Sequence, residues 1–156
     1  MTNYLVGKTE ILGDFFKNTY SNSTIISAST EKEAIEKYKA LIEPRPSPIL
    51  TKCIGVVDDN NTLIISNYTL NYNSAKNLPL ALGEQKNYLV SRLLNAPNNL
   101  SPYAFYIPQY ITATSDKEAI NIYASRHCSD SFPIHCFGYL DDQNRFIIPN
   151  INDYLK

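Results

Sequence analysis

The spacing of apolar residues changes along the chain and predicts strands and helices in a definite order. Apolar and polar residues alternate over Asn3–Val6, and a second strand-like stretch covers Thr24–Ser29. This spacing of two is typical of strands with one buried face. After Thr30 the spacing becomes helical, and the residues expected on the buried helical face are Ala34, Ile35, Tyr38, Leu41 and Ile42.

Capping boxes mark the starts of two helices. Thr30 is followed three residues later by Glu33, and Ser115 is followed in the same way by Glu118. In this motif the hydroxyl accepts a hydrogen bond from the N3 amide, while the glutamate accepts one from the amide of the N-cap residue itself. A proline-rich stretch at residues 43–48 ends the first helix, since proline cannot continue it.

A hairpin is predicted after each helix. Its turns are expected at residues 58–61 and 141–144, where Asp and Asn tolerate the backbone conformations that such turns need. The flanking strands are expected at Thr51–Val57, Thr62–Ser66, Ile134–Leu140 and Arg145–Ile148. Together with a strand at Tyr110–Thr114 before the second helix, these elements occur twice in the order β-β-α-β-β.

Three sequence blocks recur in the same order along the chain. The pairs are Asn3–Val6 with Asn87–Val90, Ile26–Ile35 with Ile111–Ile120, and Cys53–Ile65 with Cys136–Ile148. Their offsets are 84, 85 and 83 residues. This agreement predicts a tandem internal duplication.

The expected fold class is therefore α+β, built from two copies of a β-β-α-β-β unit. Residues 1–66 form the first unit, residues 67–86 a linker with room for an extra strand, and residues 87–156 the second unit. Each unit is expected to be an antiparallel sheet with one helix. Because so small a unit buries a marginal core, the two should pack as one compact pseudo-twofold body, through a continuous sheet or through their helices.

Composition and charge narrow the classes of function. Hydrophobic residues make up 44% and charged residues 19% of the chain, which is typical of a globular protein and excludes a disordered one. The net charge of −1 excludes a polyanion binder that works by bulk charge.

The 156 residues contain three cysteines, no signal-peptide core and no membrane-spanning run, so we expect a cytoplasmic protein of the producing or a recipient cell. Abundant Asn, Ile, Lys and Tyr indicate an AT-rich genome.

The densest cluster of reactive side chains contains His127, Cys128, His135 and Cys136. Cys and His are zinc ligands, and a Cys–His pair can also form a nucleophile with its base. The spacing does not match a standard zinc knuckle, and neighbours on a strand point to opposite faces. Cys136 also recurs at Cys53, which has no nearby His, so a structural role is the favoured interpretation.

Two other recurrent features have structural explanations. Asp58-Asp59 and Asp141-Asp142 could hold a cation or act as acid and base, but they lie at the hairpin turns, where Asp is an ordinary residue. Gly55 and Gly138 recur within predicted strands. A glycine there indicates a bulge or a close approach of backbone, and we expect each to lie beneath its helix.

The 12 tyrosines are the most distinctive feature of the composition. Tyrosine is enriched at protein interfaces, and variable loops are where such surfaces are built. The candidate partner-binding residues are Tyr68, Tyr72, Tyr103, Phe105, Tyr106 and Tyr110. We therefore expect a non-enzymatic protein that binds another protein, such as a small inhibitor, adaptor or effector, without a cofactor and as a monomer or homodimer.

Two alternatives stay open beside this expectation. The first is a small enzyme or zinc protein that uses the His127–Cys136 cluster. The second is a nucleic-acid-binding module, in which aromatic residues stack on bases. The balanced charge makes the second alternative weaker, because phosphate binding needs a basic groove.

Overall fold

The computed structural model describes residues 1–9, 21–42, 50–66, 80–93, 105–127 and 133–155. Within them the chain is α+β, as expected, with two α-helices and an antiparallel sheet of eight strands. The strands are β1 (Thr2–Thr9), β2 (Ser21–Ala28), β3 (Leu50–Val57), β4 (Leu63–Ile65), β5 (Lys86–Leu93), β6 (Phe105–Ala113), β7 (Ile134–Leu140) and β8 (Phe146–Ile148). The helices are α1 (Glu31–Ile42), α3 (Asp116–Arg126) and the 3₁₀ helix η4 (Ile151–Tyr154).

All eight strands belong to one sheet, in the order β2-β1-β3-β4-β8-β7-β5-β6. The expectation of a separate sheet in each unit is therefore wrong. The two short strands β4 and β8 pair antiparallel at the centre, with Ile64 opposite Ile147. This pairing removes two sheet edges whose backbone groups would otherwise lack partners.

The two sides of this central pair have the same strand order. Outward from the centre it runs β4-β3-β1-β2 on one side and β8-β7-β5-β6 on the other. The pairing of β1 with β3 shifts register between Leu5 and Val6, and that of β5 with β7 shifts between Leu89 and Val90. The chain therefore bends its sheet at the same place on both sides.

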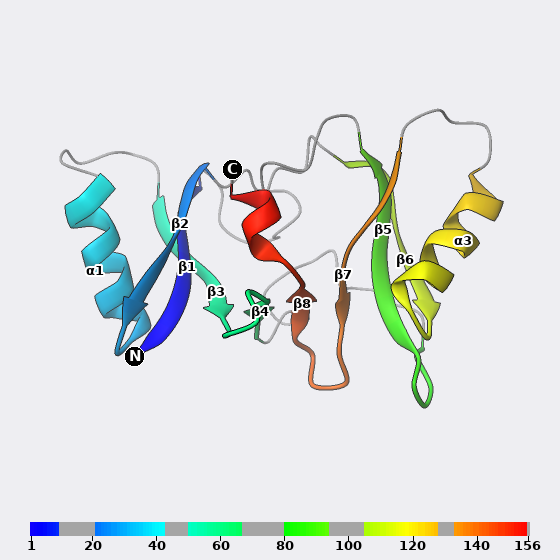
Figure 1. Cartoon of the computed structure of the whole chain (residues 1–156), viewed down its shortest axis with the longest axis horizontal. Helices are drawn as coiled ribbons and strands as arrows, with labels where there is room; N and C mark the ends of the chain where they lie inside the picture. Colours follow the sequence, from blue (N-terminus) through cyan, green and yellow to red (C-terminus); the bar gives the residue numbers. More distant parts are fainter. Residues whose placement is uncertain (10–20, 43–49, 67–79, 94–104, 128–132, 156) are drawn as a thin grey trace.

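The helices lie at opposite ends of the sheet (Figure 1). Tyr38 of α1 and Tyr123 of α3 are both completely buried and anchor their helices to the strands beneath. On the opposite face of the sheet lies the central core, which draws residues from both sides of the chain. Its buried members are Leu5, Ile54, Val57, Leu63, Ile65, Leu89, Phe137, Leu140, Phe146, Ile148, Ile151 and Tyr154.

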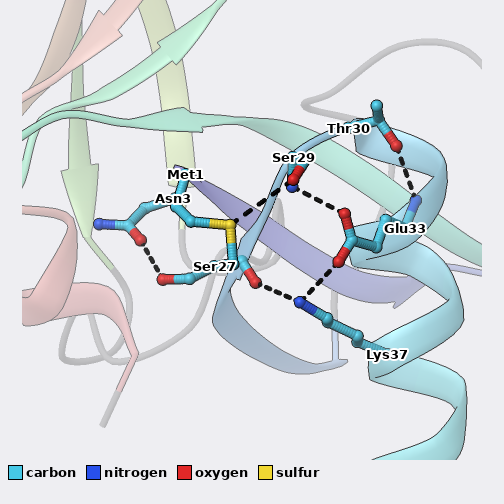
Figure 2. A network of polar contacts seen from close by, with 7 residues as sticks. All are labelled: Met1, Asn3, Ser27, Ser29, Thr30, Glu33 and Lys37. Atoms are coloured by element: carbon cyan, nitrogen blue, oxygen red, sulfur yellow. Dashed lines mark hydrogen bonds and ion pairs between the residues drawn. The ribbon is translucent and has the colours of Figure 1, made fainter.

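The N-cap hydroxyls bond as predicted, but each glutamate accepts from the amide one residue before the N-cap, that of Ser29 or Thr114. In α1, Thr30 Oγ1 accepts a hydrogen bond from the Glu33 amide at 3.1 Å, and the Glu33 carboxylate accepts one from the Ser29 amide at 2.8 Å. Figure 2 shows this box together with Lys37, whose ammonium lies 2.8 Å from Glu33. In α3, Ser115 Oγ accepts from the Glu118 amide at 3.1 Å.

Both hairpins turn as the sequence predicts. Asp58 Oδ1 accepts hydrogen bonds from the backbone amides of Asn60 and Thr62, at 2.9 and 3.0 Å. Asp141 makes the equivalent bonds in the second hairpin, both at 2.9 Å. Each turn ends on an asparagine with positive φ, a conformation that asparagine tolerates better than most residues.

The recurrent glycines do mark a close approach, but to a neighbouring strand and not to a helix. A Cβ atom at Gly55 would lie 2.5 Å from the carbonyl oxygen of Ile64 in β4, and one at Gly138 would lie 2.2 Å from that of Ile147 in β8. Both distances are far below van der Waals contact. Any side chain at these positions would push β3 from β4, or β7 from β8.

Candidate functional site

A cavity of about 350 Å³ lies beside the part of β7 that extends past β8. Strand β8 pairs only with Tyr139 and Leu140 of β7, so the chain after β8 runs along the rest of this edge. The N-terminus of α3 forms another wall. The lining residues are Tyr88, Thr114, Ser115, Asp116, His135, Cys136, Phe137, Gly138, Tyr139, Pro149, Asn150, Asp153 and Tyr154.

His135 and Tyr154 form a polar pair in this cavity. The His135 Nε2 atom is hydrogen-bonded to the Tyr154 hydroxyl, and their rings meet edge to face at 5.8 Å. Burial lowers the pKa of His135 from 6.5 against the opposing effect of Asp153, and burial raises the pKa of Tyr154. Both side chains are therefore neutral at pH 7, and each satisfies the other.

The thiol of Cys136 is held in its protonated form. Burial raises its pKa from 9.0 to about 12, with Asp116 adding to the effect. Cys53 in β3 has the same environment and a pKa of about 12 for the same main reason. Because the thiolate is the nucleophile, neither cysteine is prepared for covalent catalysis.

We expect Cys53 and Cys136 to resist alkylation in the native protein. A rise in pKa from 9.0 to about 12 lowers the thiolate fraction about a thousandfold. The measurement is iodoacetamide labelling of a Cys128→Ser variant at pH 8, with each site quantified by peptide mass spectrometry. Labelling should appear only when urea unfolds the chain. Rapid labelling in native buffer would contradict the assignment.

Two backbone amides of the first turn of α3, in the wall that this helix contributes, are already hydrogen-bonded. The Ser115 hydroxyl accepts a hydrogen bond from the Glu118 amide, and the Asp116 carboxylate accepts one from the Lys117 amide at 2.7 Å. A helix N-terminus attracts anions through such free amides. Here the amides of Lys117 and Glu118 are occupied, and Asp116 adds a negative charge at the cavity rim.

Aromatic rings form much of the remaining wall. Tyr88 and Tyr139 lie 5.5 Å apart between ring centroids, and Phe137 meets Tyr154 edge to face at 5.0 Å. The ammonium of Lys86 lies 4.3 Å from the centroid of the Tyr139 ring. One wall of the cavity therefore already holds a cation against an aromatic face.

The structure does not bring the two histidines of the His–Cys cluster to one site. The Nε2 atom of His127 lies 3.2 Å from Oε1 of Gln109, and its ring centroid lies 4.5 Å from that of Tyr123. His135 instead forms its hydrogen bond with Tyr154. Cys128 lies outside the described residues. Among the residues that are described, no three His, Cys, Asp or Glu side chains are grouped to hold a metal ion.

Most of the candidate interface tyrosines cannot be placed. Tyr68, Tyr72 and Tyr103 lie outside the described residues. Phe105 and Tyr106 belong to β6 and not to the loop in which they were expected, because the strand continues through Pro108. Proline is tolerated there since β6 is an edge strand. Tyr110 is partly buried and packs against the central core.

Sequence reasoning missed Tyr88, Asp116, Asp153 and Tyr154 as cavity residues. One signal was available at two positions of the repeat. His135 stands where the first half has Lys52, and Tyr139 stands where it has Val56. Such differences within otherwise matching blocks point to the place where one half has acquired its own chemistry.

Comparisons of the chain with known proteins identified no relative. No protein-family model, no curated protein and no solved structure matches the chain. Within the described parts of the chain, no helix is both long and apolar enough to cross a membrane. Any functional conclusion must therefore come from the site itself.

Proposed function

We propose that the protein is a non-enzymatic module that binds another protein, and that its cavity receives a side chain of that partner. The observation that carries the proposal is the chemistry of the cavity walls. The polar pair His135–Tyr154 is neutral and mutually bonded, the thiol of Cys136 is protonated, and aromatic rings surround both. This combination is suited to holding a group in place and poorly suited to moving a proton or attacking a carbon.

The size of the cavity favours one anchoring side chain. Ligand pockets usually have volumes of roughly 300–1,000 Å³, and about 350 Å³ is at the lower end of that range. Protein interfaces commonly depend on a few anchors that fill such pockets, with tyrosines prominent around them. The tyrosine-rich segments of the sequence, including Tyr103 and Tyr106, remain predicted contributors to the partner surface.

The proposal also includes the internal duplication of the chain and its location in the cytoplasm. The shared strand order and register shifts support a duplicated β-β-α-β-β unit related by a pseudo-twofold axis through β4 and β8. The free thiols of Cys53 and Cys136 are compatible with the reducing conditions of a cytoplasm. The domain limits at residues 1–66 and 87–156 stay a prediction.

The test is an affinity purification of the tagged protein from its own cells, repeated with two variants. Tyr139→Val removes a cavity wall but introduces the residue that β3 carries at the same place, Val56, so the fold should tolerate it. Leu82→Ala removes an exposed apolar side chain elsewhere. We expect one protein at near-stoichiometric recovery, and its affinity for purified Tyr139→Val should fall at least about tenfold.

The matched control decides how that loss is interpreted. Leu82→Ala should bind the partner as the unchanged protein does, and circular dichroism should show both variants folded. Equal recovery with Tyr139→Val would refute the cavity as the anchor site. Recovery of no protein above background would refute the binding module.

A further inference from the structure

We infer that the cavity is a receptor for a primary ammonium group, namely the lysine side chain of the partner. This inference rests on the proposed function and names the chemistry of the anchor. The carboxylates of Asp116 and Asp153, both exposed, lie among the cavity residues, and no Lys or Arg is found among the described residues that line it. The Lys86 ammonium over the Tyr139 ring offsets only part of their negative charge. His135 does not offset them, because it stays neutral at pH 7.

An anionic ligand is disfavoured by the same walls. The amides of Lys117 and Glu118, which would bind an anion at the start of α3, donate to Asp116 and Ser115. Ring faces carry partial negative charge and attract cations. The Lys86 ammonium on Tyr139 is an example of this contact within the protein.

The first half of the chain provides an internal precedent for the ligand. In β3, Lys52 pairs with Gly7 next to the register shift, as His135 of β7 pairs with Ser91. Each position is followed by a cysteine, and each half begins its helix with an acidic residue, Glu31 or Asp116. The first half therefore supplies its own ammonium at this position, half-buried on the sheet.

The electrostatics of Lys52 agree with this correspondence. Burial lowers the pKa of Lys52, and the negative charge of Glu31 opposes that effect. In the second half the acidic residue is kept, but the shorter imidazole of His135 replaces the lysine. None of the described residues that line the cavity supplies an ammonium in its place, and the ammonium of Lys86 lies over the Tyr139 ring.

The direct test uses n-butylammonium, which is the lysine side chain without its backbone, and butyrate as an anion of similar length. Binding to the full chain is followed by ¹H–¹⁵N NMR. We expect n-butylammonium to shift amides of Ser115, Cys136 and Tyr139, with a dissociation constant on the order of millimolar for so small a ligand. Butyrate should leave these amides unshifted.

One variant introduces the residue that the first half carries at the equivalent position, Lys52. His135→Lys places an ammonium beside the carboxylates, so it should weaken n-butylammonium binding at least about tenfold. Asp116→Asn keeps the oxygen that caps Lys117 and should weaken binding several-fold. His127→Lys, which adds the same charge away from the cavity, and Asp142→Asn, at the exposed hairpin turn, are matched controls that should bind as the unchanged protein does.

The outcomes separate this inference from the proposed function. Butyrate binding equal to that of n-butylammonium, or unaltered binding by folded His135→Lys, would overturn the inference. A captured partner that needs Tyr139 but tolerates acetylation of all its lysines would also overturn it and leave the proposed function standing. Ammonium binding without any captured protein would overturn the lysine source and identify a free amine as the ligand.

Discussion

Replacement of Gly138 by alanine is expected to lower the free energy of unfolding by about 3 kcal/mol. The new Cβ atom would lie 2.2 Å from the Ile147 carbonyl oxygen and 3.1 Å from the Phe146 ring. Both obstacles are held in place, because the carbonyl belongs to the backbone of β8 and the ring is completely buried. Strands β7 and β8 must therefore separate, next to the β4–β8 pair that joins the two sides of the sheet.

Urea unfolding followed by circular dichroism would measure the loss. Gly55→Ala should cost a similar amount, since its Cβ atom would lie 2.5 Å from the Ile64 carbonyl oxygen. Gly83→Ala is the control: its φ of +63° disfavours alanine, but no atom lies within 4 Å. That variant should lose only about 1 kcal/mol. If Gly138→Ala lost no more than this control, the close approach between β7 and β8 would be wrong.

Truncation of Phe146 to alanine is expected to cost about 4 kcal/mol and to weaken both sides of the molecule together. Phe146 is completely buried in β8, opposite Ile65 of β4. Its cluster includes Leu5 and Ile54 from the first half as well as Leu89 and others from the second. A cavity at this point removes packing that the two halves share.

Hydrogen exchange would test the shared core directly. In Phe146→Ala, the amides of β1 and β3 should lose as much protection as those of β5 and β7, because global unfolding exposes both sets. Unchanged protection in β1 and β3 would mean that the halves unfold independently. In that case the central core would not be a single cooperative unit.

Local elements could be predicted from the sequence because their signals are local. The capping boxes at Thr30 and Ser115 and the turns at Asp58 and Asp141 involve contacts within four residues. The joining of the halves could not be decided in this way. Strands β4 and β8 have three residues each, and their composition does not specify which edge they pair with. A continuous sheet and a helix-to-helix contact would both bury apolar surface.

The cavity could be predicted even less, for a geometric reason. Its walls come from separate segments around Ser115, His135 and Asp153, and they meet only because β8 is shorter than β7. Strand length at a sheet edge depends on tertiary pairing, which local propensity does not determine. The continuation of β6 through Pro108 was missed for the same reason, since the tolerance of proline depends on the strand being an edge.

The central pairing of β4 with β8 has a consequence for stoichiometry. Leu63 faces Ile148, Ile64 faces Ile147 and Ile65 faces Phe146, so the contact reads the same from either strand, as in the isologous interface of a homodimer. A true homodimer would display every surface feature twice. Here one covalent chain carries Lys52 on one side and His135 on the other. The inferred ammonium site would therefore be present once in each chain, which favours a one-to-one complex with the proposed partner.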